Sequence, residues 1–256
     1  MIAVISPAKS LDFDTSYAFE STSVPYPEKS MTLVKEMQTK TAEDLQELMK
    51  VSEKIAQLNV ERFYHFSHEY IKDENAKHAL FAFNGDVYQG LDAQSLSEED
   101  VHYAQGHLRI LSGLYALLRP LDLIQAYRLE MGTRLKFDQY KNLYDFWGNQ
   151  ITALLNQELE QGNHKYLLNL ASNEYFKSVK KKELKAQVLE VDFKDYKNGQ
   201  YKTISFFAKK ARGMMTRFFI ENKCQSIEEI QQFDQAGYNF SQENSSKEKL
   251  VFLRKQ

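Results

Sequence analysis

Residues 1–9 read Met1-Ile2-Ala3-Val4-Ile5-Ser6-Pro7-Ala8-Lys9, so that five apolar positions end abruptly in turn-forming and charged residues. This pattern is typical of a buried strand whose carboxyl end opens onto a loop. Similar runs recur along the chain and alternate with segments of helical periodicity, which predicts an α/β fold with a mixed sheet covered by helices. The predicted strands are 1–6, 80–83, 108–112, 166–171, 188–193, 201–206 and 250–253.

The helices are predicted from their start signals. Residues 226–229, SIEE, fit a capping box, and residues 97–100 and 41–44 are acidic variants of it. The pair Asn198-Gly199 permits the positive φ angles of a tight turn, so we expect an antiparallel hairpin over 188–206. The chain shows no domain boundary, and we expect one domain over 1–256. The predicted helices are 29–40, 42–49, 53–66, 98–107, 146–161 and 208–222.

The composition is that of an ordinary globular protein. Of the 256 residues, 43% are hydrophobic and 27% charged, with 10 glycines and 4 prolines, which excludes a disordered chain, a collagen-like fibre and a disulfide scaffold. The single cysteine, Cys224, excludes an internal disulfide and a multi-cysteine metal site. No segment approaches the ~18 apolar residues of a membrane span. We therefore expect a reducing, cytoplasmic compartment, no membrane partner, no metal and no cofactor.

Charge is unevenly distributed along the chain. Residues 1–104 contain 9 basic and 18 acidic residues, whereas residues 105–256 contain 24 basic and 17 acidic residues. Within 177–217 the counts are 12 and 4. A local excess of positive charge attracts phosphate even on a protein with a net charge of −2. The alternative is that this block is a solvated, lysine-rich surface.

Polar residues gather where the apolar runs end. In α/β folds, ligands bind outside the carboxyl ends of strands, and the helix starts found there favour anions. These loops would form one anion-binding cleft if they converge, and would be ordinary turns if they do not. The candidate phosphate-binding residues are Lys9, Arg119, Arg128, Lys177, Lys209, Lys210 and Arg212, and the candidate base-stacking residues are Tyr88, Tyr115 and Tyr175.

Acidic residues in the same loops leave a second possibility open. Glu130 is either a general base or the partner of a neighbouring arginine, and Asp122 is expected to pair with Arg119 within a turn. An enzyme acting on a nucleotide or damaged base would use these groups. Its candidate catalytic residues are Glu130, Glu174, Asp86, Ser172 and Tyr175.

Residues 45–56, LQELMKVSEKIA, resemble a degenerate helix-hairpin-helix, which we place at about 42–66. Lys50 and Ser52 stand at the two glycine positions, and the loss of both glycines restricts the backbone. Ser52 is expected to cap the second helix, and Lys50 and Lys54 to supply charge to one DNA phosphate. The alternative is two packed helices joined by a short turn.

Several motifs together resemble the bacterial YaaA family of peroxide-stress proteins, in order along nearly the whole chain. They are 6–12 (SPAKSLD), 83–88 (FNGDVY), 111–115 (LSGLY), 118–122 (LRPLD), 127–132 (YRLEMG), 146–148 (FWG), 169–172 (NLAS), 174–177 (EYFK) and 208–213 (AKKARG). This chain has Ser10 where the family usually has Thr, and Ala116 where Gly is common.

The resemblance implies a cytoplasmic protein of the hydrogen peroxide response that limits oxidative damage and free intracellular iron. It also implies a compact α/β fold peculiar to the family, a positively charged cleft, a helix-hairpin-helix, and double-stranded or distorted DNA as the partner. It implies no particular reaction. The sequence does not determine the oligomeric state, and we take a monomer as the expectation.

Overall fold

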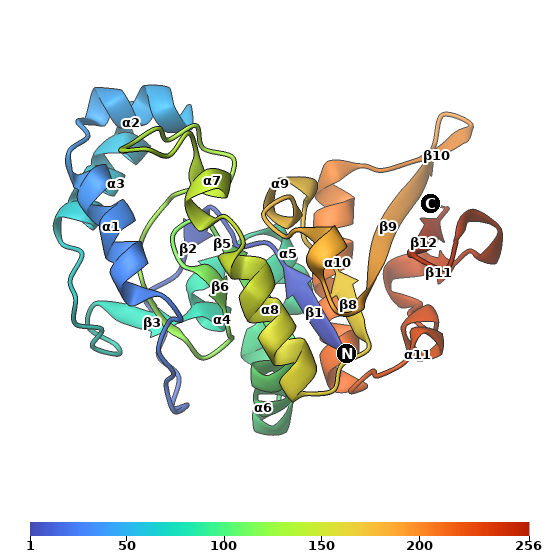
Figure 1. Ribbon diagram of the computed structural model, residues 1–256. Coiled ribbons are helices and arrows are strands. Elements are labelled where there is room, and N and C mark those ends of the chain that lie inside the picture. The colour runs from blue at the N-terminus through green and yellow to red at the C-terminus, as the bar shows by residue number, and fades with distance from the viewer. Residues whose placement is uncertain (256) are drawn as a thin grey trace.

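The computed structural model describes residues 1–255 and confirms the α/β fold (Figure 1). Within this range, eight strands form one mixed sheet in the order β11-β12-β9-β8-β1-β5-β6, with β10 paired to β9. These strands are β1 (Ile2–Ile5), β5 (Leu108–Ser112), β6 (Ala116–Leu118), β8 (Tyr166–Asn169), β9 (Gln187–Lys197), β10 (Gln200–Lys202), β11 (Tyr238–Phe240) and β12 (Lys249–Arg254).

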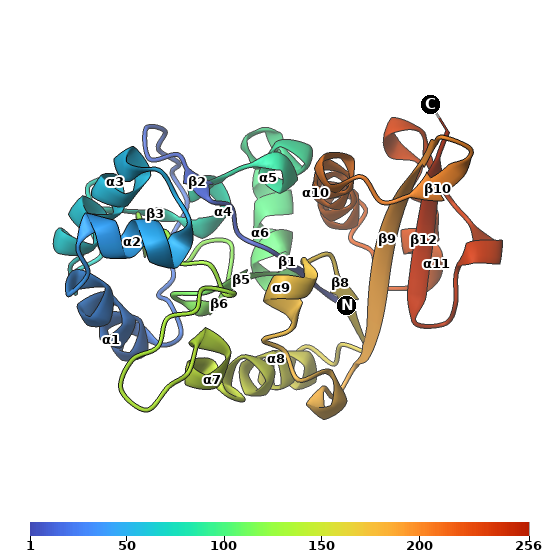
Figure 2. The same cartoon turned by 90° about the horizontal axis from the view of Figure 1, so that it is seen from above.

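The centre of the sheet is parallel and buried. β1 lies between β5 and β8, with Ala3 opposite both Leu108 and Leu168, and β8 continues in parallel to β9 and β12. Every residue of β1 and β5 is buried, because helices cover both faces of a parallel sheet. Figure 2 shows α5, α6 and α10 on one face and α7, α8 and α9 on the other. The carboxyl ends of the parallel strands therefore open along one shared edge.

The first three helices form a lobe at one end of the sheet, together with two short antiparallel ladders, β2 (Ser10–Leu11) with β4 (Phe83–Asn84) and β3 (Ala76–His78) with β7 (Leu123–Gln125). The helices are α1 (Pro27–Gln38), α2 (Ala42–Met49), α3 (Glu53–Tyr64), α4 (Ala79–Ala82), α5 (Asp86–Leu91), α6 (Glu98–His107), α7 (Leu143–Trp147), α8 (Gln150–Gln161), α9 (Asn173–Phe176), α10 (Ser205–Glu221) and α11 (Ile227–Gln231).

Local signals predicted most of these elements. The capping boxes at Thr41 and Ser226 are present, and β9 and β10 form the expected hairpin with positive φ at Asn198 and Gly199. The strand predicted over 80–83 is wrong. Most of it is helix α4, because a short buried apolar run has no periodicity that separates strand from helix.

Two other predicted boundaries also need correction. The strand over 201–206 ends at Lys202, and Ser205 already begins α10. The helix over 146–161 is divided into α7 and α8, because Gly148 adopts a φ of +53° between them. In both places the backbone changes direction within a few residues, which the hydrophobic pattern does not reveal.

Close contact between α5 and α10 explains part of the 208–213 motif. A Cβ atom on Gly213 would lie 1.9 Å from the carbonyl oxygen of Val87, and one on Gly90 would lie 2.2 Å from that of Lys210. Ala208 and Ala211 are also buried on α10. Small residues thus allow the two backbones to touch, and this contact places the start of α10 beside the carboxyl edge of the sheet.

We predict that Gly213→Ala destabilises the protein by at least about 2 kcal/mol, although alanine favours helices, because the added methyl group overlaps backbone atoms of α5. Urea unfolding measures the change in the free energy of unfolding. Gly106→Ala in α6 is the control, since its methyl group would meet no atom within 4 Å and should leave stability unchanged or slightly higher. Equal behaviour of the two variants would contradict the packing argument.

Candidate functional site

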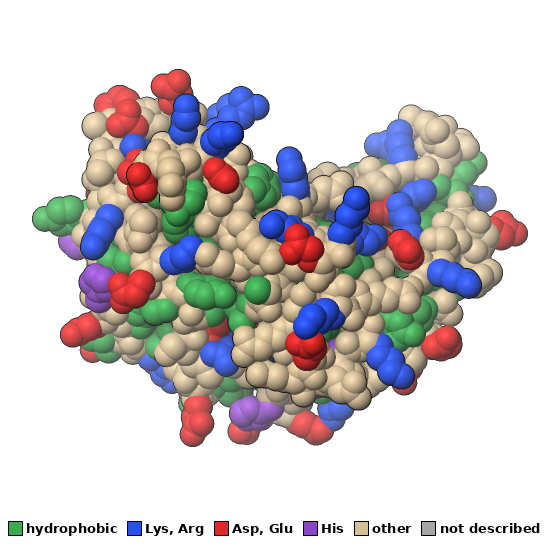
Figure 3. All heavy atoms as spheres, in the orientation of Figure 1, with side chains coloured by type: hydrophobic (Ala, Val, Ile, Leu, Met, Phe, Trp, Pro, Cys, Tyr) green, Lys and Arg blue, Asp and Glu red, His purple; other side chains and the backbone are tan. Residues whose placement is uncertain are grey.

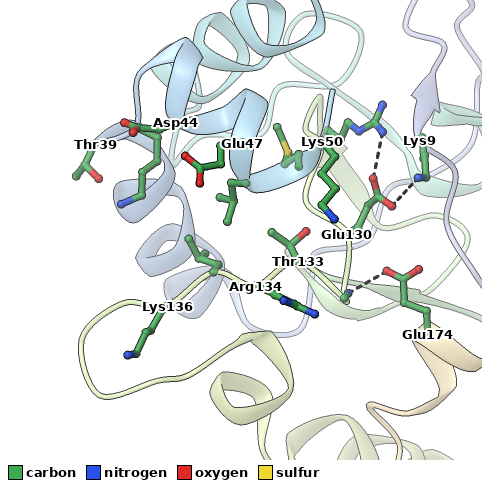
Figure 4. Close-up of a pocket in the computed structure, with 16 residues that line it drawn as sticks. Lys9, Thr39, Asp44, Glu47, Lys50, Glu130, Thr133, Arg134, Lys136 and Glu174 are labelled. Atoms are coloured by element: carbon green, nitrogen blue, oxygen red, sulfur yellow. Dashed lines mark hydrogen bonds and ion pairs between the residues drawn. The ribbon is translucent and has the colours of Figure 1, made fainter. Parts of the chain in front are cut away.

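A pocket of about 970 Å³ lies between the α1–α3 lobe and the carboxyl edge of the sheet (Figure 4). Figure 3 shows the molecule hollowed on this side, with lysine and arginine side chains on both rims. The charged side chains that line the pocket are Lys9, Lys40, Lys50, Arg128, Arg134, Lys136, Asp44, Glu47, Glu130 and Glu174. Segments that are far apart in the sequence therefore supply six cations and four anions to one pocket.

Glu130 lies between two cations that come from different segments. Its Oε2 is 2.7 Å from Lys9 Nζ, and its Oε1 accepts a hydrogen bond of 3.1 Å from Arg128 Nη2. Charge-assisted hydrogen bonds hold both oxygens of the carboxylate, so Glu130 is the counter-ion of Lys9 and Arg128. This confirms that Glu130 is the partner of a neighbouring arginine.

The positive charge beside Glu130 exceeds what one carboxylate neutralises. Burial, followed by the neighbouring guanidinium of Arg128, lowers the pKa of Arg62 from its usual value. The Nε of Arg128 is buried and has no hydrogen-bond partner among residues 1–255. Arg62, on α3, was not among the residues predicted from the sequence. Arg62 and Arg128 therefore lie close enough for their charges to repel, next to the carboxylate of Glu130.

Three cations of the pocket lining have no counter-ion. Lys50, Arg134 and Lys136 are exposed and form no ion pair within the described part of the chain. Lys50 ends α2 in the left-handed conformation (φ 53°, ψ 54°) and extends toward the segment that carries Glu130 and Arg134 (Figure 4). These side chains are held in solvent with their charge available to a ligand.

Sequence reasoning missed Arg134 and Lys136, although a signal for them was present. Met131, Thr133 and Leu135 are buried and alternate with exposed residues, as in a half-buried extended segment. Because side chains alternate between the two faces of an extended segment, this pattern places Arg134 and Lys136 on the exposed face. Only the fold shows that this face lines the pocket.

Glu174 joins the pocket from α9. Its Oε1 accepts a hydrogen bond of 2.9 Å from the backbone N–H of Gly132, and a Cβ atom at Gly132 would lie 2.9 Å from the same oxygen. Tyr144 donates a hydrogen bond to the carbonyl oxygen of Glu174, and Lys177 Nζ lies 5.2 Å from the centre of the Tyr144 ring. A side chain at position 132 would therefore displace the Glu174 carboxylate, and Lys177 lies beside the pocket rather than in its lining.

The three predicted base-stacking tyrosines belong to the core. Tyr88, Tyr115 and Tyr175 are 6%, 0% and 8% exposed, and burial raises the pKa of each above its usual value. The Tyr88 hydroxyl donates to the carbonyl oxygen of Ser6, and that of Tyr115 accepts from the Gln125 N–H. A ring packed on both faces cannot stack on a base, so the stacking prediction for these residues is wrong. Burial also leaves Tyr175 without access to a substrate.

Several other predicted residues lie outside the pocket lining. Arg119 pairs with buried Asp122 at 3.0 Å, which confirms the structural role of that pair in the turn. Lys209 Nζ lies 3.7 Å from Asp86, so this acidic candidate is the partner of a lysine. The remaining predicted residues that do not line the pocket are Ser52, Lys54, Ser172, Lys210 and Arg212.

Arg212 and Ser172 occupy the carboxyl edge of the sheet. Burial lowers the pKa of Arg212, and the carboxylates of Asp192 and Glu190 partly oppose this shift. The Nε of Arg212 is buried without a partner among the described residues. The backbone N–H of Ser172 donates to Ser6 Oγ at 2.9 Å, which ties the loop after β8 to the loop after β1.

Residues 42–64 form two packed helices joined by a turn at 50–52. Ser52 precedes α3 in an extended conformation, but its side chain forms no capping hydrogen bond, contrary to expectation. Lys50 adopts the left-handed conformation that glycine normally supplies at such a turn. The helix-hairpin-helix assignment itself stays a prediction.

Residues 1–255 contain no group of three or more histidine, cysteine, aspartate or glutamate side chains placed to hold a metal ion. No helix in the same range has both the length and the apolar character needed to span a membrane.

The fold and the pocket define an α/β protein with a cation-lined pocket at the carboxyl edge of its sheet. Residues 1–244 match the family described as peroxide stress protein YaaA, and the chain belongs to this family. It is 55% identical over 257 residues to a UPF0246 protein of Aliivibrio fischeri strain MJ11, covering 100% of this chain and 99% of that protein. It is 55% identical over 255 residues to one of Shewanella halifaxensis, covering 99% of each chain. It is 53% identical to one of Alteromonas mediterranea, covering 100% of this chain and 99% of that protein.

We predict that Glu130→Gln lowers the free energy of unfolding by about 1–3 kcal/mol in dilute chloride buffer, because Lys9 and Arg128 lose their counter-ion. Inorganic phosphate should restore part of this stability by binding the exposed cations. Thermal unfolding with increasing phosphate measures both effects.

Glu158→Gln is the matched control. Glu158 is 17% exposed, compared with 19% for Glu130, and pairs with Arg109 at 2.6 Å outside the pocket. This variant should lose stability without being rescued by phosphate. The same response to phosphate in both variants would show that the pocket has no special affinity for anions.

Proposed function

We propose that this protein binds DNA through the cation-lined pocket, as part of the peroxide stress response to which its family belongs. The observation that supports the proposal is the presence of Lys50, Arg134 and Lys136 in the lining of one pocket. None of these three cations has a counter-ion within the described part of the chain. Unpaired cations on separate elements suit a ligand that carries several phosphates along its length.

The cations with a counter-ion and those without one would contribute differently to binding. Lys50, Arg134 and Lys136 are available at once, because they form no ion pair within residues 1–255. Lys9 and Arg128 are already paired with Glu130, so a phosphate must compete with that carboxylate. Most of the salt-dependent affinity therefore comes from Lys50, Arg134 and Lys136. Lys177, Lys209, Lys210 and Arg212 extend the positive surface along the sheet edge.

The turn between α2 and α3 fits the same proposal. Lys50 is both a pocket residue and the left-handed residue of this turn. The predicted helix-hairpin-helix contact with one phosphate would then be made by Lys50, with Ser52 and Lys54 exposed beside it. A role in limiting free iron, which the family resemblance implies, stays a prediction.

A nucleotide-directed enzyme is the second candidate, favoured by the enclosure of Glu130 and Glu174 in one pocket. Glu174 is the better catalytic candidate, since the structure gives its carboxylate one hydrogen bond, from a backbone amide, whereas Glu130 is held by two cations. Glu174→Gln separates the two functions. Binding alone predicts unchanged DNA affinity and unchanged peroxide protection, whereas catalysis predicts loss of protection with DNA affinity retained.

We predict that changing Lys50, Arg134 and Lys136 together to Ala weakens binding to a random-sequence duplex at least about tenfold and reduces the slope of log affinity against log salt by about 3. Fluorescence polarisation over a salt series measures both quantities. Each phosphate contact releases about one counter-ion from the DNA on binding. The loss of three contacts should therefore reduce the salt slope as well as the affinity.

The control changes Lys35, Lys165 and Lys247 to Ala, which alters net charge equally at exposed positions outside this pocket. Its salt slope should stay close to that of the unaltered protein. An unaltered protein without measurable affinity for DNA, or a pocket variant that matches this control, would refute the proposal.

A further inference from the structure

The hairpin of β9 and β10 presents two aromatic rings to solvent. Tyr196 and Tyr201 are direct partners in the antiparallel register, with ring centres 5.2 Å apart and planes inclined by 65°. They are 40% and 41% exposed, and neither belongs to the core. The hairpin lies at the opposite end of the molecule from α2 (Figures 1 and 2). The pair is therefore separate from the pocket and from the buried tyrosines.

Positive charge surrounds this pair. Lys255 Nζ lies 5.3 Å from the centre of the Tyr196 ring. Lys194, Lys197 and Lys202 on the same hairpin form no ion pair within residues 1–255, and Asp195 is buried and bound to Arg254. The hairpin thus carries lysines whose charge no nearby carboxylate neutralises.

The register places part of this charge on the same side as the rings. Side chains alternate along a strand, so Lys194 shares a face of β9 with Tyr196. Glu190 and Asp192 lie further along that face, but each is engaged by a lysine, Lys181 and Lys249 respectively. The surface next to Tyr196 therefore combines exposed rings with net positive charge.

We propose that Tyr196 and Tyr201 stack on unpaired DNA bases, with Lys194 and Lys255, which lie beside Tyr196, on the adjoining phosphates. Exposed aromatic rings among cations are the arrangement that binds single strands, since every base offers a face for stacking and every nucleotide a phosphate. Bases inside a duplex already stack on each other and offer no free face. This inference rests on the proposed DNA binding and adds one feature of the substrate, a stretch of unpaired bases.

The test compares the unaltered protein with the variant Tyr196→Ala/Tyr201→Ala on two DNA probes. The probes are a labelled oligo(dT) strand of about 15 nucleotides and a duplex of matched length, both measured by fluorescence polarisation at one salt concentration. We expect the variant to lose at least about tenfold in affinity for the single strand and to bind the duplex as before. Tyr196→Phe/Tyr201→Phe retains both ring faces and should bind oligo(dT) within about twofold of the unaltered protein.

The outcomes separate this inference from the proposed function. An unaltered protein that binds neither probe overturns both. Duplex binding with no loss of oligo(dT) affinity in the alanine variant overturns only the stacking site. If the phenylalanine variant loses as much affinity as the alanine variant, the hydroxyl groups and not the ring faces make the contact. If the alanine variant changes only the sedimentation of the free protein, the pair is a contact between copies of the chain. Either result also overturns the stacking site.

Discussion

The carboxylate of Glu130, held between Lys9 and Arg128, is the interaction on which the rest of the site depends. It joins the loop after β1 to the segment after β7, two parts of the chain more than a hundred residues apart. It also offsets the repulsion between Lys9 and Arg128. One anion between two cations lets the protein fold with these groups close together while the site as a whole stays positive. A phosphate that enters would replace, or add to, a counter-ion already present.

The sheet makes this arrangement possible. Five neighbouring parallel strands end along one edge, and the loops that follow β1 and β8 are tied together there through Ser6 and Ser172. Glycine matters where backbones meet, because a Cβ atom on Gly113 would lie 2.3 Å from the carbonyl oxygen of Leu129, next to Glu130. The segment that carries Arg128, Glu130 and Arg134 can therefore cross closely over the end of β5. Because residue 113 is a glycine, the two backbones touch, and this contact sets the positions of the cations that the segment carries.

The sequence predicted those features that depend on neighbouring residues. Capping signals identified the starts of α2, α6 and α11, apolar runs identified β1, β5, β8 and β12, and Asn198-Gly199 identified the hairpin turn. Of the residues predicted in the polar loops, Lys9, Arg128, Glu130 and Glu174 line the pocket, whereas Arg119, Lys177, Lys209, Lys210 and Arg212 do not. Features that depend on tertiary packing could not be predicted from the sequence. Tyr88, Tyr115 and Tyr175 lie in or next to polar loops of the sequence, yet the fold buries them. Arg62, on α3, comes close to Arg128 only in the folded protein.

A crystal structure of the protein soaked in tungstate would test the central claim most directly, because this phosphate-like anion is located by its anomalous scattering. The account predicts the strongest peak inside the pocket, within hydrogen-bond distance of Lys50, Arg134 or the Lys9–Arg128 pair. Strong peaks confined to isolated surface lysines, with none in the pocket, would contradict it.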